Sequence, residues 1–333
     1  MSASKSQMER TAFDTWTREA ATATAVIARV TGATTLTSTV PKEFVHRSAV
    51  AEVLLTDWAR VDDTHFRISA QWPRGHSFFT PVAEGYHDPL IVCETIRQAG
   101  ILLGHAEFGV PLGHQFIIWD LDVAVHPEHL LVGYAPAALS IDVACTEITR
   151  RGGKLSGMRI TAVFHRDGNV VATGTGSFSC LAPAVYRRVR GDHTAGGDWH
   201  QLPLISPAAP QSVGRMSPMD VVLSPTAEDN YWQLRVDTRH PVLFEHPVDH
   251  IPGTVLIEAA RQATAAVLRR SSYLPLSIAT RFTRFVELDA PCMVEARLLD
   301  DAASPGVQTV LVTALQAGEP AFSAIVTAGS HGL

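Results

Sequence analysis

Apolar and polar positions along the chain follow two different spacings, and the spacing predicts the elements. Residues 65–72 alternate apolar and polar side chains, as a half-buried strand does. Residues 87–99 and 250–263 instead each lead into an apolar helix pattern. Strand-like runs follow both helices, at 116–119, 139–143, 157–164 and 170–178 in the first half and at 277–287, 293–299, 309–315 and 320–327 in the second. The order strand, helix, antiparallel strands therefore occurs twice.

The two helix patterns share one motif, Glu-x-x-Arg-Gln-Ala. It contains Glu94, Arg97 and Gln98 in the first copy and Glu258, Arg261 and Gln262 in the second. Each residue of the second copy follows its counterpart by the same number of residues. With this offset kept and no gap, residues 76–112 and 240–276 are identical at seven of 37 positions, where composition alone gives roughly two. The chain therefore reads as two copies of one fold, each with an acid, a cation and a nearby histidine.

Length and composition limit the possible functions. A chain of 333 residues with 46% hydrophobic and 18% charged residues is expected to form two well-buried domains. The net charge of −6 argues against a nucleic-acid partner, and no apolar run is long enough to span a membrane. The four cysteines have no CxxC spacing, so we expect buried free thiols in a reducing compartment. No secretion signal is recognised, and the expected location is the cytoplasm.

Composition also predicts the domain boundaries. Residues 1–38 are expected to form an N-terminal extension and residues 39–185 the first domain. Glycines and prolines between 186 and 225 interrupt the pattern and predict a linker, after which residues 226–333 form the second domain. A long helix wrapped by an antiparallel sheet is the hot-dog arrangement. The predicted fold class is therefore α+β, a double hot-dog protein.

The second helix motif resembles that of one enzyme family. Residues 252–262 (PGTVLIEAARQ) are similar to the Pro-Gly-Val-Leu-x-x-Glu-Ala-x-Ala-Gln stretch of hot-dog β-hydroxyacyl-thioester dehydratases. Arg97 and Arg261 stand where that motif has a small or apolar residue, and residues 244–247 (FEHP) only approximate its Gly-His-Phe-Pro. A dehydratase or thioesterase acting on an acyl thioester is therefore an alternative rather than the main hypothesis.

A wider set of segments resembles the A-factor biosynthesis proteins, the γ-butyrolactone synthases of actinomycetes. These segments are 40–47 (VPKEFVHR), 51–58 (AEVLLTDW), 70–79 (AQWPRGHSFF), 88–98 (DPLIVCETIRQ) and 282–291 (FTRFVELDAP). The resemblance implies transfer of a β-ketoacyl group from a carrier-protein (ACP) or coenzyme A (CoA) thioester to a hydroxyl of dihydroxyacetone phosphate, toward a diffusible signal. It also implies a tandem hot-dog protein, either a monomer with an internal pseudo-dimer or a homodimer.

That chemistry needs a base for the hydroxyl proton, a donor for the oxyanion and a cation for the phosphate. We expect the free N–H groups at the two helix starts to face the thioester carbonyl oxygen. The expected catalytic residues are Glu94, Glu258 and His87, with His76 as an alternative base. The expected substrate-binding residues are Arg97, Arg261, Arg284, Gln98 and Gln262.

Simpler roles stay open for the same residues. Each Glu-x-x-Arg pair can be a structural ion pair along its helix, the glutamines can make helix contacts, and His87 can be a turn histidine.

No dinucleotide-binding, Walker, nucleophile-elbow or metal-ligand motif occurs, so no nicotinamide, flavin or metal cofactor is expected. A catalytically inactive hot-dog pair that binds an acyl or lactone ligand and acts as a regulator is the alternative outside the enzymes.

Overall fold

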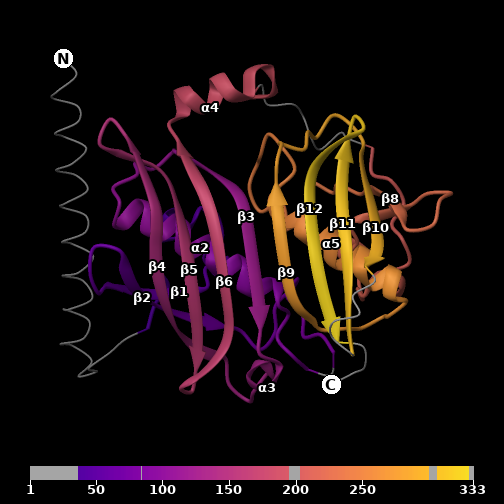
Figure 1. Cartoon of the computed structure of the whole chain (residues 1–333), viewed down its shortest axis with the longest axis horizontal. Coiled ribbons are helices and arrows are strands. Elements are labelled where there is room, and N and C mark those ends of the chain that lie inside the picture. The colour runs from indigo at the N-terminus through magenta and orange to yellow at the C-terminus, as the bar shows by residue number, and fades with distance from the viewer. Residues whose placement is uncertain (1–36, 84, 195–202, 300–305, 330–333) are drawn as a thin grey trace. The chain divides into compact units, whose positions relative to one another are not determined.

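The computed structural model describes residues 37–83, 85–194, 203–299 and 306–329, and a compact unit begins at Thr39. In this described part, twelve strands form one antiparallel sheet in the order β1-β2-β4-β5-β6-β3-β9-β12-β11-β10-β8-β7 (Figure 1). The first half supplies β1 (Leu55–Arg60), β2 (His65–Trp72), β3 (Gln115–Val125), β4 (Ala137–Arg151), β5 (Lys154–Arg166) and β6 (Asn169–Leu181). The second half supplies β7 (Leu223–Pro225), β8 (Tyr231–Leu234), β9 (Pro275–Phe282), β10 (Cys292–Leu299), β11 (Val307–Gln316) and β12 (Glu319–Gly329).

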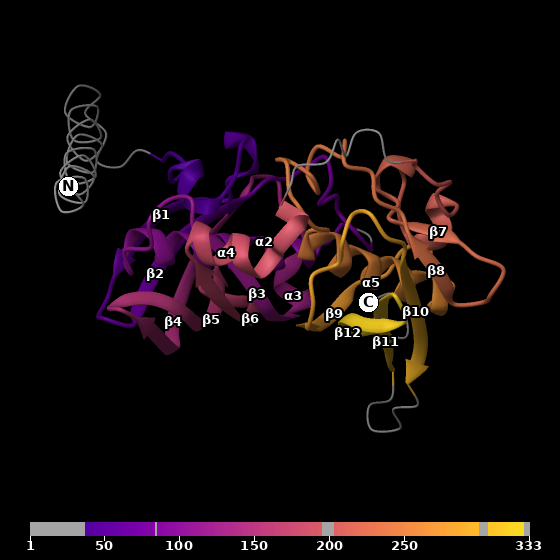
Figure 2. The same cartoon turned by 90° about the horizontal axis from the view of Figure 1, so that it is seen from above.

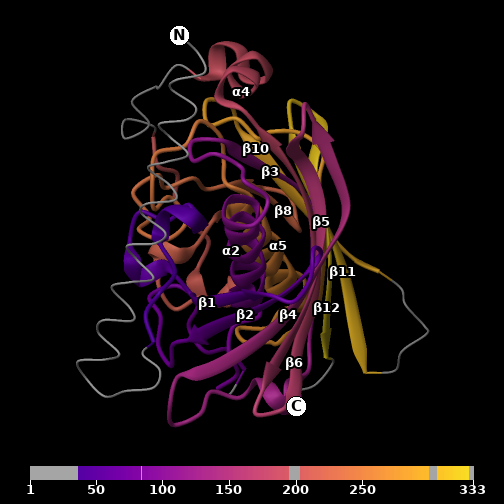
Figure 3. The ribbon, with the colours of Figure 1, turned by 90° about the vertical axis from the view of Figure 1, so that its left-hand side faces the viewer.

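One long helix from each half lies on the same face of the sheet. These helices are α2 (Leu90–Ala106) and α5 (Gly253–Leu268), and the strands curve around them (Figure 3). The strand pattern explains the packing, because every second residue of β2 is buried toward this side. On α2 even polar residues are buried, since the short helix η1 (Lys42–Val45) also packs against it. None of the helices within the described ranges is long and apolar enough to cross a membrane.

The two halves meet at the middle of the sheet, where β3 pairs with β9 (Figures 1 and 2). The register places Asp120 opposite Arg281 and Leu121 opposite Thr280. The Thr280 hydroxyl donates to the backbone oxygen of Leu121 at 2.7 Å and accepts from its N–H at 3.0 Å, so a buried side chain reinforces the junction. The predicted α+β double arrangement, with each half wrapping an antiparallel sheet around one long helix, is confirmed.

Part of the predicted linker, residues 186–225, forms regular structure. The helix α4 (Pro183–Arg190) and the short helix η3 (Gly191–Thr194) begin it, and η5 (Pro210–Val213), η6 (Pro218–Asp220) and β7 end it. The last three correspond to η1, η2 (Val50–Glu52) and the start of β1 in the first half. Each begins the same number of residues after its counterpart. The second half therefore includes segments that precede residue 226. The predicted extension lies outside the described residues except for residues 37 and 38.

Candidate active site

The carboxylate of Glu94 lies at the centre of a hydrogen-bonded cluster on α2. Its two oxygens accept from Nε and Nη2 of Arg47 at 3.0 and 2.7 Å. They also accept from Nε and Nη2 of Arg97, both at 2.9 Å, and from the amide of Gln98 at 2.6 Å. Glu94 is only 2% exposed, so the cluster is almost completely withdrawn from water. Charge-assisted hydrogen bonds of this kind are strong and fix the geometry of the groups they join.

The electrostatics of this cluster hold Glu94 in its ionised form. Burial alone raises the pKa of Glu94, but the charges of Arg47 and Arg97 outweigh burial and lower the pKa to about 2. A carboxylate with so low a pKa is a weak proton acceptor near neutral pH. Its arrangement instead suits the positioning of two guanidinium groups.

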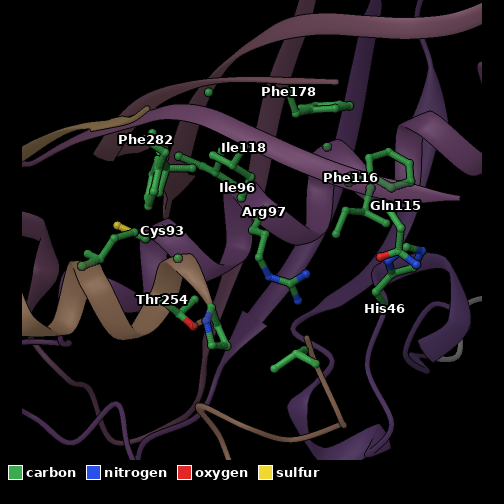
Figure 4. A pocket seen from close by; sticks show the side chains of 18 of the residues that line it. His46, Cys93, Ile96, Arg97, Gln115, Phe116, Ile118, Phe178, Thr254 and Phe282 are labelled. Atoms are coloured by element: carbon green, nitrogen blue, oxygen red, sulfur yellow. The ribbon is translucent and has the colours of Figure 1, made fainter. Parts of the chain in front are cut away.

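Arg97 directs the free part of its guanidinium into a cavity. Nε and Nη2 bind Glu94, and Nη2 also donates to the backbone oxygen of Val45 at 3.2 Å. Nη1 has no hydrogen-bond partner among the described residues. Figure 4 shows the Arg97 side chain reaching into the cavity between Thr254 and His46. A planar cation with free N–H groups at this place can bind an anionic oxygen.

The cavity has a volume of about 200 Å³ and is bounded by both halves of the chain. One wall is apolar and comes from α2 and the sheet, with Ile96, Phe116, Ile118, Ile160, Phe178 and Phe282. The polar wall of the cavity includes Arg97, His46, Glu245, His246 and His250. The cavity can therefore hold a molecule that has an apolar chain at one end and a charged group at the other.

The start of α5 also lines this cavity, and no side chain caps it. Pro252, Gly253 and Thr254 all contribute to the wall, and no side-chain acceptor in the described part of the chain binds the first N–H groups of the helix. Unpaired N–H groups at a helix start carry partial positive charge and attract a negative oxygen. Gly253 lies close to the ring of Phe282, since a Cβ atom built on Gly253 would be 3.1 Å from that ring.

Three histidines belong to the polar wall, and His46 has a fixed state. Nδ1 of His105 donates to the backbone oxygen of Val110 at 2.7 Å, so Nε2 of His105 accepts from Nε2 of His46 at 2.8 Å. Burial, with the nearby charges of His105 and Arg97, lowers the pKa of His46 to about 3. His46 is therefore uncharged at neutral pH. Within the described ranges, no group of three or more His, Cys, Asp or Glu side chains is arranged to hold a metal ion.

The second half contains the same cluster in a closed form. Glu258 accepts from Nε and Nη2 of Arg215, both at 2.8 Å, from Nε and Nη2 of Arg261 at 2.9 and 2.7 Å, and from Gln262. Nη1 of Arg261 is also used, because it lies 3.4 Å from the backbone oxygen of Gly214. The side chain of Arg261 is 2% exposed, compared with 15% for Arg97. All three guanidinium nitrogens of Arg261 are thus engaged within the protein.

A carboxyl group of the chain occupies the helix start that faces this second cluster. Asp88, which is 1% exposed, accepts the N–H of Leu90 at 3.0 Å and so caps α2. Burial raises the pKa of Asp88, while the positive charges of Arg261 and Arg215 oppose that rise. The equivalent of Asp88 in the second copy is Pro252, which has no such group. The helix start is therefore capped in one half and free in the other.

The structure brings together some of the predicted site residues and separates others. Glu94, Arg97 and Gln98 form one cluster, and their counterparts form the second. Both glutamines are 0% exposed and bind backbone groups in addition to the acid, so neither amide faces the cavity. Arg284 is exposed and lines a neighbouring cavity of about 180 Å³, which shares His250, Gly253 and Phe282 with the first.

Neither histidine expected to act as a base lines the cavity beside Arg97. His87 is 4% exposed and packs on Trp72 with ring centroids 5.5 Å apart, and burial lowers its pKa to about 4. His76 accepts two backbone N–H groups at Nδ1, and its Nε2 lies 3.3 Å from Glu52. His240, aligned with His76 from the sequence, repeats this arrangement in the second half. Both members of this pair hold local backbone in place.

Sequence reasoning missed Arg47 and Arg215, although the sequence contains evidence for them. Arg215 follows Arg47 by the same number of residues as Val213 follows Val45. This separation is four residues larger than the separation between the two helix motifs. A comparison without gaps therefore fails to align them. An alignment that allows a four-residue gap between the first strand and the helix matches both arginines.

Comparison with known proteins agrees with this organisation. The family described as "A-factor biosynthesis hotdog domain" matches residues 29–182 and again residues 199–330. The chain is 52% identical over 291 residues to a "2-oxo-3-(phosphooxy)propyl 3-oxoalkanoate synthase" of Streptomyces virginiae, covering 87% of this chain and 98% of that one. It is 40% identical over 285 residues to a protein of the same name from Streptomyces griseus, covering 86% of this chain and 94% of that one.

Solved structures add no argument beyond these matches. The chain is similar to an acyl-ACP thioesterase from Bacteroides thetaiotaomicron with a TM-score of 0.48 and 10% identity, covering 79% of this chain and 97% of that one. The assignment rests on the two family matches, which cover both halves, and on the relatives that are alike over nearly their full length. The chain belongs to the A-factor biosynthesis hotdog domain family.

Proposed function

We propose that this protein transfers a 3-oxoacyl group from a thioester to the free hydroxyl of dihydroxyacetone phosphate, in the biosynthesis of a γ-butyrolactone-type signal. The name of the Streptomyces relatives describes the product, an ester of a 3-oxoalkanoic acid with a phosphorylated three-carbon ketone. The single observation that carries the proposal is the placement of Arg97 Nη1 and the uncapped start of α5 in one cavity with an apolar wall.

In this proposal Arg97 binds the phosphate of the acceptor. Its Nη1 has no partner in the part of the chain that the structure describes, whereas Arg47 uses Nη1 on Glu245 at 3.3 Å and its other nitrogens on Glu94. Glu245 is fixed in turn by the backbone N–H groups of Ser48 and Ala49 at 2.7 and 2.6 Å. These contacts hold the cations in position before substrate arrives, which lowers the entropy cost of binding.

The donor thioester occupies the apolar side of the same cavity. The carbonyl oxygen lies at the start of α5, where the N–H groups of Gly253 and Thr254 stabilise the oxyanion that forms in the tetrahedral intermediate. The acyl chain extends between α2 and the sheet along Ile96 and Phe178. The carrier arm, from ACP or CoA, enters through the neighbouring cavity that contains Arg284. We also place the reaction in the cytoplasm.

Glu94 acts as a positioning residue in this scheme. Its ionised carboxylate orients Arg97, and its low pKa makes it unsuited to accept the hydroxyl proton. Glu258 and Arg261 have the same local geometry but belong to the closed cluster, so we assign them a structural role. One chain then has one working site, which is assembled from both halves.

The test is to incubate the purified protein with a 3-oxoacyl thioester, with and without dihydroxyacetone phosphate, and to follow free thiol and the mass of the ester. Thiol release that depends on the phosphate acceptor and yields the ester supports the proposal. Release at the same rate without the acceptor identifies a thioesterase, and loss of water from a 3-hydroxyacyl thioester, supplied in a separate incubation, identifies a dehydratase. Tight ligand binding with no turnover identifies a binding protein.

A further inference from the structure

A histidine and an aspartate that the roles above do not use form a hydrogen-bonded pair at the cavity wall. Nδ1 of His250 donates to Oδ1 of Asp249 at 2.7 Å. Nε2 of His250 has no hydrogen-bond partner among the described residues, and the side chain is 26% exposed. His250 lines both cavities and lies three residues before Gly253 in the sequence. The imidazole therefore lines the same two cavities as Gly253 at the uncapped start of α5.

The aspartate of the pair is held from the other side by α4. The hydroxyl of Tyr186 donates to Oδ1 of Asp249 at 2.6 Å, and Nε of Arg190 donates to Oδ2 at 3.1 Å. Arg190 also donates to the two oxygens of Glu287 at 2.7 and 2.6 Å, and its side chain is 2% exposed. Burial raises the pKa of Asp249, but the hydrogen bonds from His250 and Tyr186 and the charge of Arg190 lower it overall. Asp249 is therefore ionised at neutral pH.

This network fixes both the orientation and the tautomer of His250. Because an ionised carboxylate only accepts hydrogen bonds, the proton of neutral His250 is on Nδ1 and the lone pair is on Nε2. The ring is further restrained by Phe285, which it meets edge to face with centroids 4.8 Å apart. A carboxylate behind an imidazole holds the ring in place and stabilises the imidazolium that forms when the ring takes a proton.

The two other histidines of the cavity, and the Glu94 carboxylate that Arg97 binds, are less suited to accept a proton. His46 has a pKa of about 3 and uses Nε2 on His105. The pKa of His246 is lowered, chiefly by burial, and its Nδ1 is 3.5 Å from a glutamate that Arg47 already binds. Glu94 is saturated by donors. His250 alone among these groups combines a free ring nitrogen, an ionised partner and a position at the start of α5.

We propose that His250 is the general base of the acyl transfer and that Asp249, held by Tyr186 and Arg190 of α4, is its positioning residue. This inference rests on the proposed function. Nε2 of His250 takes the hydroxyl proton of dihydroxyacetone phosphate as the oxygen forms a bond to the thioester carbonyl carbon. The tetrahedral intermediate then breaks its carbon–sulfur bond, and the imidazolium returns the proton to the leaving sulfur. Thioester and alcohol give ester and thiol, and the histidine is again neutral.

The proposal gives α4 a role in the site. This helix follows β6 at the end of the first half, yet Tyr186 and Arg190 both contact Asp249 in the second half. The segment that the sequence marks as a linker thus supports the base from behind, as the position of α4 above the sheet in Figure 1 allows. Changes in α4 should affect the rate of transfer without touching substrate.

The test compares four variants of the full-length protein with wild type: His250→Asn, His250→Ala, Asp249→Asn and Tyr186→Phe. His250→Asn keeps a side-chain N–H that can donate to Asp249 but has no basic nitrogen. We expect its kcat to fall about 10²-fold or more, the scale of a lost general base, with KM for dihydroxyacetone phosphate changed less than about 3-fold. Added imidazole should restore part of the activity of His250→Ala. His126→Gln, a change at an exposed histidine outside both cavities, is the matched control.

The pH profile supplies a readout that a purely structural role does not change. In wild type the rate should fall as the pH drops and the base becomes protonated. Loss of the Asp249 charge makes the imidazolium less stable, so Asp249→Asn should move this fall to lower pH and reduce kcat about 10-fold or more. Tyr186→Phe should cause a smaller loss of kcat, again with KM nearly constant. The titratable groups that face His250 Nδ1 are Asp249 and Tyr186, with Arg190 and Glu287 behind them.

The outcomes separate the two proposals. If wild type and His126→Gln release thiol in response to dihydroxyacetone phosphate and His250→Asn does so at the same rate and with the same pH profile, the assignment of His250 is overturned while the proposed function stands. If wild type shows no acceptor-dependent release, both are overturned. Folding of each variant is checked by circular dichroism, and rescue of His250→Ala by imidazole supports the base independently of any change in stability.

Discussion

Arg47 and Arg215 occupy equivalent positions in the two halves, and each donates through Nε and Nη2 to the helix glutamate of its own half. Their third nitrogens differ. Nη1 of Arg47 turns to Glu245 beside the cavity, whereas Nη1 of Arg215 donates to the backbone oxygen of Phe78 at 2.7 Å in the interior. One duplicated cluster has therefore become two different structures, an open one that faces a cavity and a closed one that supports the fold.

This difference predicts that substitution of Arg97 weakens substrate binding, whereas substitution of Arg261 lowers the stability of the fold. Arg97→Ala removes the free guanidinium from the cavity, and we expect KM for dihydroxyacetone phosphate to rise about 10- to 100-fold, since a hydrogen bond to a charged group contributes about 1.5–3 kcal/mol. Steady-state kinetics with the acceptor varied measures the effect. Unchanged KM in the Arg97→Ala variant would remove this residue from the phosphate site.

Arg261→Ala serves as the matched comparison, with the same chemical change in the closed cluster. It leaves Glu258 buried with one cation fewer, and breaking a buried ion pair costs about 3–5 kcal/mol of the free energy of unfolding. Urea denaturation should show this loss. Below the unfolding transition, the KM for the acceptor should stay within about 3-fold of wild type. A large rise in KM with normal stability would show that the second cluster also binds substrate.

The buried glutamates predict a specific dependence of stability on pH. The folded-state pKa values of Glu94 and Glu258 are both lowered from 4.5 to about 2. A carboxyl group whose pKa is lower in the folded state stabilises the fold fully above its unfolded pKa, and this stabilisation is lost as the pH falls through the folded pKa. The free energy of unfolding should therefore decrease between about pH 4.5 and pH 2.

The contribution of each glutamate to this decrease is on the order of 3 kcal/mol. Urea unfolding at several pH values in Glu94→Gln and Glu258→Gln measures it. Each variant should be less stable than wild type at pH 7 and should lose less stability on acidification. If both variants lost stability with pH as steeply as wild type does, other carboxyl groups would have to account for the acid sensitivity.

The helix start at Gly253 predicts the effect of removing one N–H group. Pro252 has φ −58° and ψ 143°, a conformation that a residue before proline adopts readily, and proline is tolerated in the first turn of a helix. Gly253→Pro should therefore fold and yet lack an oxyanion donor, with kcat lowered about 10²–10³-fold. Gly253→Ala is the control, because it adds the same Cβ atom 3.1 Å from Phe282 but keeps the N–H. Equal activity of the two variants would argue against the N–H as a donor.

The sequence predicted the architecture well, because the periodic burial of β2 and the apolar character of α2 and α5 are local properties. The helix segments expected at 87–99 and 250–263 are α2 and α5 within a few residues at their starts. The edge strand β7 was missed because it has three residues and contains Pro225, which gives no alternating pattern. It lies in the segment that glycine and proline content marked as a linker.

The site was predictable only in part, and the reason is spatial. Glu94 and Arg97 are three residues apart on one helix, so their contact follows from helical geometry. Arg47 reaches Glu94 from a segment 47 residues away, and that contact depends on how η1 packs on α2. His250 and Asp249 are adjacent in the sequence, but the burial of Arg190 behind them depends on α4, which periodicity does not position. Likewise, the difference between the open and closed clusters arises from groups such as Asp88 and Gly214 that come from other segments.

The apolar wall of the cavity predicts how acyl-chain preference can be changed. Phe178 lies against α2 close to Gly100, where a Cβ atom on the glycine would be 2.8 Å from the phenyl ring. Phe178→Leu removes part of this wall and should allow a longer acyl chain to be buried. Each additional buried methylene contributes about 0.8 kcal/mol. The ratio of kcat/KM for a donor one carbon longer to kcat/KM for the shorter donor should therefore be about 4-fold higher in the variant than in wild type.

Phe164→Leu is the matched control for this change, because Phe164 is fully buried against Trp72 and lies outside the cavity wall. It should lower the free energy of unfolding through loss of packing, with no change in the ratio of kcat/KM between donors. The measurement is a competition between 3-oxoacyl thioesters of different length, read by the masses of the ester products. If both variants shifted the ratio alike, general loosening of the core would explain it. A shift confined to Phe178→Leu would assign the acyl chain to the space between α2 and the sheet.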